Sequence, residues 1–221
     1  MSVFEPHWET LPPAQQELWP QLGAGVELGL VLYGGTAAAL RLGHRTSIDF
    51  DFFTEKELDR EAIQSKFPFV HDAKVVQDRP DSFGVLASTS TNPVKVSFFG
   101  KIDIGRVGAP ERTSDGVIAV ASLLDLLATK LKVLQQRVEA KDYRDVAAIL
   151  RANVNLEDGL AAAAALYKPL FQPSEAVRAL TYFHGGDLEE LPAEDRQTLV
   201  TAAARLRSIP FLTPVSRSLS S

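Results

Sequence analysis

One stretch of 21 residues at positions 33–53, YGGTAAALRLGHRTSIDFDFF, constrains this chain more than any other. A Gly-Gly pair opens a short Ala-rich segment, and two aspartates at i and i+2 follow in a run of β-branched and aromatic residues. Carboxylates in an apolar sheet cost free energy unless something pairs with them. We therefore interpret the stretch as a site that binds a charged ligand rather than as scaffold alone.

The composition narrows the class of protein. The 221 residues are enough for one large domain or two small ones, and 45% apolar with 23% charged residues is ordinary for a globular protein. The net charge of −5 argues against a broad, salt-driven nucleic-acid binder, although a local basic patch that meets one RNA end stays compatible with it. The absence of cysteine excludes disulfides and thiolate metal sites. We expect a cytoplasmic protein without membrane contact, because neither a signal-peptide pattern nor an apolar stretch of about 20 residues occurs.

Strands dominate the first half of the chain. Residues 14–28 are compatible with helix on either side of Pro20, and a capping-box pattern of Thr54 and Glu57 predicts the start of a later helix. Apolar runs and period-two alternation predict the remaining elements. Helices are expected over 36–42 and 54–66, strands over 28–33, 48–53, 73–77, 82–90 and 93–99, and short extended segments at 102–104 and 117–120.

Helical spacing takes over after Ser122. Within residues 122–152 apolar residues recur at helical spacing over 123–134 and again over 146–150, and further helices are expected over 156–170, 174–183 (with Ser174 as its cap) and 193–208. Strands first and helices second predict an α+β fold, in which a mixed β-sheet domain over 1–120 precedes a helical bundle over 121–221.

Asp49 and Asp51 are the first candidate site residues. On a strand, residues i and i+2 point to the same face with Cα atoms about 6.5 Å apart, so two carboxylates can converge on metal ions. A divalent cation would remove their mutual repulsion, and oxygen ligands favour Mg²⁺ or Mn²⁺. The alternative is an edge strand with two solvated aspartates.

Gly34, Gly35 and Thr36 join a predicted strand to a predicted helix. Glycine lets the backbone approach phosphate oxygens closely, and the start of the helix offers free N–H groups together with the Thr36 hydroxyl. The alternative is a tight turn that merely needs glycine. Because the two aspartates follow some 13 residues later, a phosphate and metal site is the favoured interpretation.

Five more polar residues accompany these motifs. Arg45 and Ser47 immediately precede the aspartates, where they could orient the carboxylates or contact a phosphate. Lys95 and Ser97 share one face of the strand at 93–99, so both could line the active-site face, with Asp103 as a further carboxylate a few residues on. Ordinary surface positions are the alternative for each.

The helical half contains a second polar group. Lys130, Arg137, Lys141 and Asp145 are spaced so that one continuous helix would place them on one face, with Asp142 beside them. A positive stripe there would neutralise phosphate charge and a leaving pyrophosphate. A solvated helix face is the alternative, and a break near 138–140 would spoil the geometry.

Taken together, these residues resemble a known family, the AbiEii/AbiGii toxin family of nucleotidyltransferases within the polymerase-β-like superfamily. The matching segments are GGTAAALRLGHRTSIDFDFF at 34–53, VKVSFF at 94–99, DLLATKL at 125–131, KDYRD at 141–145 and ALTYFHGGD at 179–187. The resemblance implies a nucleotidyltransferase-type sheet domain and the toxin half of a type IV toxin–antitoxin or phage-defence system. It also implies an NTP substrate with Mg²⁺ or Mn²⁺, an RNA or tRNA acceptor and a cognate antitoxin.

The resemblance also assigns roles by position. Gly34, Gly35 and Thr36 would hold the triphosphate and Asp49 and Asp51 the metals, and the other matching positions are Lys95, Lys130, Lys141, Asp142 and Asp145. One departure stands out: many superfamily members have a third carboxylate where this chain has Ser97. That role could fall to Asp103 or Asp142, to water, or to nothing.

Three hypotheses follow. The favoured one is a Mg²⁺-dependent nucleotidyltransferase that moves an NMP from an NTP to an acceptor hydroxyl. The second, motivated by Ser97, is a non-catalytic module that binds NTP and Mg²⁺ and acts through a protein partner. The third is an interaction protein in which the motifs are vestigial.

Overall fold

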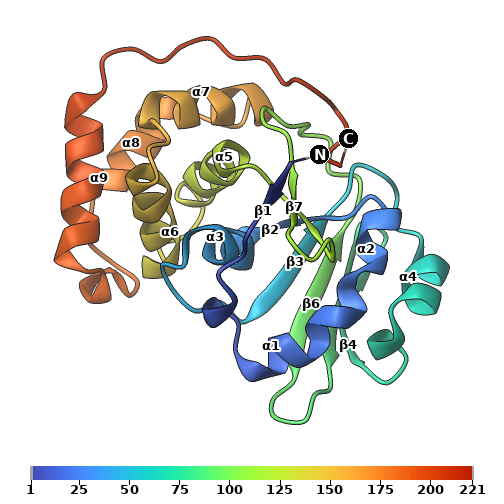
Figure 1. The fold of residues 1–221 in the computed structure, drawn as a ribbon. Coiled ribbons are helices and arrows are strands. Elements are labelled where there is room, and N and C mark those ends of the chain that lie inside the picture. The colour runs from blue at the N-terminus through green and yellow to red at the C-terminus, as the bar shows by residue number, and fades with distance from the viewer. Residues whose placement is uncertain (1, 221) are drawn as a thin grey trace. The chain divides into compact units, whose positions relative to one another are not determined.

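The structure is a computed structural model that describes residues 2–220, and its chain forms two compact units (Figure 1). The first, here called the sheet unit, consists of residues 2–105, 109–122 and 216–220. The second, here called the helical unit, consists of residues 106–108 and 123–215. No helix within residues 2–220 is long and apolar enough to span a membrane.

The sheet unit is built on a mixed sheet whose strands lie in the order β1-β7-β8-β2-β3-β6-β5-β4. The pairs β1–β7, β2–β8 and β3–β6 are parallel and the other pairs are antiparallel. The strands are β1 (Val3–Phe4), β2 (Val31–Tyr33), β3 (Asp49–Phe53), β4 (Lys74–Arg79), β5 (Ser82–Ala87), β6 (Val94–Phe99), β7 (Glu111–Thr113) and β8 (Ala119–Val120).

Short helices accompany this sheet, and α1, α2 and α4 lie along the same face of it in Figure 1. The α-helices of the unit are α1 (Pro13–Leu18), α2 (Ala24–Glu27), α3 (Gly34–Leu42) and α4 (Arg60–Lys66). The 3-10 helices are η1 (Trp8–Thr10), η2 (Trp19–Leu22) and η3 (Pro68–Val70). Residues 14–28, expected to be helical on either side of Pro20, thus form the three short pieces α1, η2 and α2.

An aromatic core holds these helices to one face of the sheet. Phe50, Phe52 and Phe98 are fully buried, and the ring centroids of Phe52 and Phe98 lie 5.9 Å apart. Trp19 from η2 reaches the Phe50 ring at 6.2 Å, and Phe67 reaches the Phe98 ring at 5.3 Å. Since side chains alternate along β3, packing Phe50 and Phe52 on this face turns the two aspartates of the strand to the other face.

The start of α4 corrects one sequence prediction. The helix begins at Arg60, and the Asp59 side chain accepts a 2.9 Å hydrogen bond from the Ala62 N–H, so Asp59 is its cap. Thr54, the expected cap, instead accepts a 3.3 Å hydrogen bond from the Lys56 N–H within a turn. Both residue types suit an N-cap. Asp59, which is closer in sequence to the buried Ile63, is the one that caps α4.

The helical unit is a bundle in which α5 packs against α7, α6 against α9, and α8 against both α7 and α9. Its elements are α5 (Leu123–Val133), α6 (Ala140–Arg151), α7 (Leu156–Leu166), α8 (Pro173–Thr181), η4 (Leu188–Glu190) and α9 (Ala193–Arg205). The helix expected over 123–150 is interrupted between Val133 and Ala140, and α8 begins one residue before Ser174 with Gln172 as its cap residue.

The α5–α7 contact depends on a glycine. A Cβ atom placed on Gly159 would lie 2.6 Å from Leu127 Cγ and 3.3 Å from Leu131 Cδ1, well inside van der Waals contact. The absence of a side chain on Gly159 therefore lets two apolar helices approach closely.

We expect Gly159→Ala to lower the free energy of unfolding. Overpacking costs about 1–3 kcal/mol, which exceeds the gain of at most about 1 kcal/mol in helix propensity. Gly23→Ala is the control, because Gly23 has helical backbone angles and a Cβ there meets nothing within 4 Å; it should be neutral or stabilising. Urea denaturation measures both, and a Gly159→Ala protein as stable as the parent contradicts the packing account.

Candidate active site

The two glycines at the start of α3 lie against site side chains. Gly34 has φ +74°, and a Cβ atom on it would lie 2.9 Å from Asp51 Oδ2. A Cβ on Gly35 would collide with the guanidinium of Arg45 and lie 3.1 Å from Ser47 Oγ. Any other residue would push these side chains aside, so the glycines place bare backbone between an acidic and a basic group.

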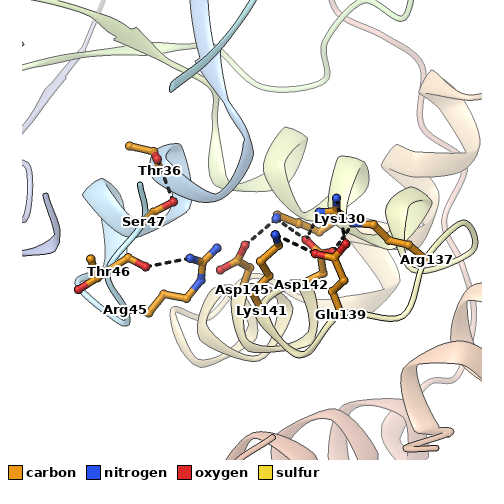
Figure 2. A network of polar contacts seen from close by, with 10 residues as sticks. All are labelled: Thr36, Arg45, Thr46, Ser47, Lys130, Arg137, Glu139, Lys141, Asp142 and Asp145. Atoms are coloured by element: carbon orange, nitrogen blue, oxygen red, sulfur yellow. Dashed lines mark hydrogen bonds and ion pairs between the residues drawn. The ribbon is translucent and has the colours of Figure 1, made fainter. Parts of the chain in front are cut away.

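Three hydroxyl and carbonyl groups connect α3 to the start of β3. The Thr36 hydroxyl donates to the backbone carbonyl of Asp49, and it forms a 2.9 Å hydrogen bond with the Ser47 hydroxyl (Figure 2). Thr36 and Ser47 are buried, at 1% and 9% exposure. Their hydroxyls therefore fix the start of the helix relative to the aspartate strand, and Thr36 acts as a structural connection.

Asp49 and Asp51 are half-buried on one face of β3. Asp51 pairs across the sheet with Tyr33 on one side and with Ser97 on the other, while Asp49 pairs with Lys95. Since residues opposite each other in paired strands share a face, Lys95 and Ser97 lie on the carboxylate face. Lys95 is exposed and Ser97 is 2% exposed.

These residues suit a magnesium ion that shares its coordination with a substrate. Mg²⁺ is usually bound by one or two carboxylates, with water and substrate phosphates completing its octahedron. Asp49 and Asp51 supply two carboxylates on one face, and Arg45 lies at the helix start where phosphate charge would lie. Within residues 2–220 no three Asp, Glu, His or Cys side chains are placed to hold a metal ion together, so no third such ligand accompanies Asp49 and Asp51.

Asp103, one candidate for a third carboxylate, is a surface residue. Its side chain is 83% exposed and its nearest ionic partner, Arg217, lies 3.9 Å away.

Arg45 donates a 3.0 Å hydrogen bond to the Thr46 carbonyl (Figure 2). The sheet unit thus brings together, around the start of α3 and one face of β3 and β6, the predicted residues Gly34, Gly35, Thr36, Arg45, Ser47, Asp49, Asp51 and Lys95.

In the helical unit, three of the predicted residues form a buried ionic network. Lys130 Nζ lies 2.7 Å from Asp142 Oδ1 and 2.6 Å from Asp145 Oδ2 (Figure 2). Asp142 and Asp145 are fully buried, and Lys130 is 5% exposed. Arg137 Nε donates to Asp142 Oδ2 at 2.8 Å, so Asp142 is held by two cations.

The pKa of Asp142 reflects these contacts. Burial alone would raise it, but hydrogen bonds from Arg137 and the charge of Lys130 outweigh burial and hold the pKa below its usual range. A carboxylate with a depressed pKa contributes stability above its unfolded pKa and loses that contribution as the pH falls through its folded pKa. Asp142 therefore stabilises the helical unit at neutral pH in its ionised form.

Lys141 lies outside this network. Its side chain is 53% exposed and its amino group pairs with Glu139 at 2.8 Å (Figure 2). Lys130 to Asp145 do not occupy one continuous helix, because α5 ends at Val133 and α6 begins at Ala140; the break that would spoil the single-face arrangement is present. The interruption turns the two helices so that Lys130 pairs inward with α6 while Lys141 points to the surface.

Sequence reasoning missed two anchoring residues. Arg41, near the end of α3, pairs with Glu111 and donates to the Ala121 carbonyl at 2.8 Å, so it ties α3 to β7 and to the residue after β8. Asp125 is 1% exposed and accepts hydrogen bonds from the Val107 and Gly108 N–H groups at 2.8 and 2.9 Å. Neither role has a local signal, since each partner is 17 or more residues away in sequence.

The sequence of this chain matches a known protein family. The sequence model of one family, described as nucleotidyl transferase AbiEii toxin of type IV toxin–antitoxin systems, matches residues 24–208. The chain belongs to this family. The AbiEii match includes the glycine pair, both aspartates and the buried network, and it makes the protein a member of a nucleotidyltransferase family, as the sequence resemblance had indicated.

Two relatives accompany the AbiEii match. An uncharacterised protein of Aquifex aeolicus (strain VF5) is 32% identical over 122 residues, which are 54% of this chain and 57% of that protein. MenT4, a nucleotidyltransferase toxin of Mycobacterium tuberculosis H37Rv, has a solved structure that aligns with a TM-score of 0.43 at 18% identity, covering 88% of this chain and 91% of that one. The chain thus spans somewhat more than half the length of the Aquifex relative.

We expect Lys130→Met to destabilise this AbiEii-family protein by about 3–5 kcal/mol, because the change leaves buried carboxylates without their shared cation. Lys141→Met is the control, since an exposed ion pair contributes about 0–1 kcal/mol. Urea denaturation at neutral pH measures both. A Lys130→Met protein within 1 kcal/mol of the parent would show that the buried network contributes little.

Proposed function

We propose that this protein is a Mg²⁺-dependent nucleotidyltransferase that moves an NMP from an NTP to a hydroxyl of an RNA acceptor. The observation that supports this most strongly is the convergence of three features in the sheet unit. The bare backbone of Gly34 and Gly35 lies against Asp51 and Arg45, and Asp49 shares the face of Asp51. This arrangement suits an anion at the glycines beside Arg45 and a cation at Asp49 and Asp51.

The start of α3 is the proposed triphosphate site. The cap residue Tyr33 makes no side-chain capping hydrogen bond to this helix, and the N–H groups at a helix start suit an anion. Arg45 contributes positive charge beside Gly35, and the exposed Lys95 lies on the same face as Asp49. Ser47 and Thr36 are buried in mutual contact, and their proposed role is to position this helix start.

Asp49 and Asp51 are the proposed metal ligands, with Mg²⁺ or Mn²⁺ as the ion. When bound, the ion supplies positive charge that stabilises the attacking and leaving oxygens of phosphoryl transfer. In the proposed reaction an acceptor oxygen forms a bond to the α-phosphorus, the bond from that phosphorus to the bridging oxygen of the β-phosphate breaks, and pyrophosphate leaves. The proton of the acceptor hydroxyl passes to solvent.

Lys130, Asp142 and Asp145 are proposed to act as positioning residues. A lysine amino group paired at 2.7 Å or less with two buried carboxylates cannot contact a substrate without abandoning them. Lys141 is exposed and paired with Glu139, outside these contacts. We therefore propose no phosphate contact for Lys130.

A second candidate function for the same site is nucleotide binding without catalysis. Ser97 is buried directly opposite Asp51, at the position where a third carboxylate would activate the acceptor hydroxyl. A protein with this arrangement could bind NTP and Mg²⁺ and act through a protein partner without turnover. The AbiEii family implies a cognate antitoxin as such a partner in either case.

Label transfer tests the proposal. We expect incubation with α-³²P-labelled NTPs, Mg²⁺ and total cellular RNA to label an RNA band, and Asp49→Asn/Asp51→Asn to reduce the label by at least about a hundredfold. Asp72→Asn, which changes an exposed carboxylate outside the site, is the matched control and should retain transfer. Thermal unfolding establishes that both variants fold.

Two results would contradict the proposal. Unchanged transfer in the Asp49→Asn/Asp51→Asn protein would remove the metal assignment. NTP binding by calorimetry, together with no labelled product across RNA and protein acceptors, would replace the enzyme by the non-catalytic binding module.

A further inference from the structure

The sheet of the sheet unit ends in four neighbouring strands, in the order β3-β6-β5-β4 (Figure 1). One face of these strands packs into the aromatic core, and the other, the carboxylate face, bears Asp49 and Asp51. Residues opposite each other in paired strands share a face. The strand register therefore shows which side chains accompany the aspartates as far as the edge strand β4.

Three rows of paired residues cross the carboxylate face. From β3 to β4 the rows are Asp49–Lys95–Leu86–Lys74, Asp51–Ser97–Gly84–Gln77 and Phe53–Phe99–Ser82–Arg79. Neighbouring strands are about 4.8 Å apart, so the edge of the sheet lies about 14 Å across it from the aspartate strand. Two rows thus begin at a carboxylate, and two of the three end at a basic residue.

A β-bulge brings the basic residues of β4 to this face. The register between β4 and β5 shifts by one residue between Val75 and Gln77. Without the shift, Lys74 and Gln77 would point to opposite faces, because side chains alternate along a strand. With it, Lys74 lies on the same face as Gln77 and Arg79, which is how a bulge re-aims a side chain.

The carboxylate face is basic between the aspartates and the sheet edge. Lys74, Arg79 and Lys95 are exposed, and within residues 2–220 none of the three side chains has an ionic or hydrogen-bond partner. Asp78, the acidic residue of β4, lies opposite the buried Phe83 and so belongs to the other face. In a protein of net charge −5, this local set of cations suits a polyanion.

The geometry of transfer relates this surface to the acceptor. In an in-line displacement the attacking and leaving oxygens lie on opposite sides of the α-phosphorus. The proposed triphosphate site is the start of α3, which follows β2 on one side of the aspartate strand. Pyrophosphate leaves on that side, so the acceptor approaches from the side of β6, β5 and β4.

We propose that the carboxylate face of β6, β5 and β4 binds the sugar–phosphate backbone of the RNA acceptor, with Lys74 and Arg79 as phosphate contacts. The proposal rests on the nucleotidyltransferase function and adds the path by which the acceptor hydroxyl reaches Asp49 and Asp51. Because the contacts are to phosphates, they give affinity and orientation without reading the base sequence.

Salt-dependent RNA binding tests these contacts without turnover. The probe is a short fluorescent single-stranded oligoribonucleotide, with Mg²⁺ and without NTP, and anisotropy measures its affinity. We expect Lys74→Gln/Arg79→Gln to weaken binding at least about fivefold at low salt. The slope of log affinity against log salt concentration should become less steep by about 1.4, which is about 0.7 for each lost phosphate contact on a single strand.

A matched control removes the same charge from the other face. Lys56 and Lys66 are exposed, and they precede and end α4, which packs on the core side of the sheet. Lys56→Gln/Lys66→Gln should therefore keep the affinity within about twofold and leave the salt slope unchanged. Thermal unfolding establishes that both double variants fold.

The absence of cysteine allows a second test, of direction. Gln77→Cys and Val75→Cys each place one thiol on β4 without changing the charge, the first on the carboxylate face and the second on the core face. Val75 is 50% exposed, so a photocrosslinker can be attached there as well. We expect RNA crosslinks from position 77 to exceed those from position 75 severalfold.

Other results would overturn the RNA surface or separate it from the transferase. Unchanged affinity and salt slope in Lys74→Gln/Arg79→Gln, or equal crosslinking from both positions, would overturn it, and label transfer to RNA by the parent would then leave the transferase standing. The basic residues would in that case only protect an edge strand from pairing.

Two further outcomes concern the identity of the polyanion. Binding of poly-L-glutamate but not of RNA, lost in Lys74→Gln/Arg79→Gln, would replace the RNA by an acidic protein partner. RNA affinity that depends on Lys74 and Arg79, without label transfer by the parent to any acceptor, would refute the transferase and retain the RNA surface.

Discussion

The sheet unit depends on the alternation of side chains along β3. Phe50 and Phe52 point into an aromatic core shared with Trp19 and Phe98, which fixes the rotation of the strand. Slipping the register by one residue would bury the aspartates and expose the rings, so the register is strongly specified. The same constraint that builds the core thus sets two carboxylates on the opposite face, beside the glycine-rich start of α3.

The helical unit depends on pairing its buried carboxylates with cations. Two fully buried carboxylates on α6 are balanced by Lys130 from α5 and, for Asp142, by Arg137 from the segment between the helices. Removing both charges of such a pair is often tolerated, but removing one partner leaves an uncompensated buried charge. The network therefore specifies how α5 and α6 pack, and this specification is why we assign its members a positioning role.

The sequence predicted the parts of the fold in which local pattern and tertiary packing agree. The aspartate strand, the helix after the glycines and its end at Gly43, with φ +64°, all follow from period, composition and turn chemistry. The sequence left the break between α5 and α6 as an alternative, because the polar residues at 135–137 and 141–142 are compatible either with a solvated helix face or with a loop. The strands β1 and β7 were missed, since two or three residues carry no periodic signal and these strands depend on pairing with each other and, for β7, with β8.

The candidate site was predictable from the sequence where its residues lie close together in the chain. Gly34, Gly35, Asp49 and Asp51 are close in sequence, so their meeting follows from one strand–helix–strand unit. The burial of Lys130 depends on long-range packing that no local pattern encodes.

The most direct test of the central claim is a crystal structure with Mn²⁺ and a non-hydrolysable NTP analogue, in which anomalous scattering locates the metal. The account predicts an anomalous peak within coordination distance, about 2.1 Å, of carboxylate oxygens of both Asp49 and Asp51, with the phosphates at the start of α3. A bound nucleotide whose metal lies away from these two carboxylates, or whose phosphates lie away from Gly34 and Gly35, would contradict it.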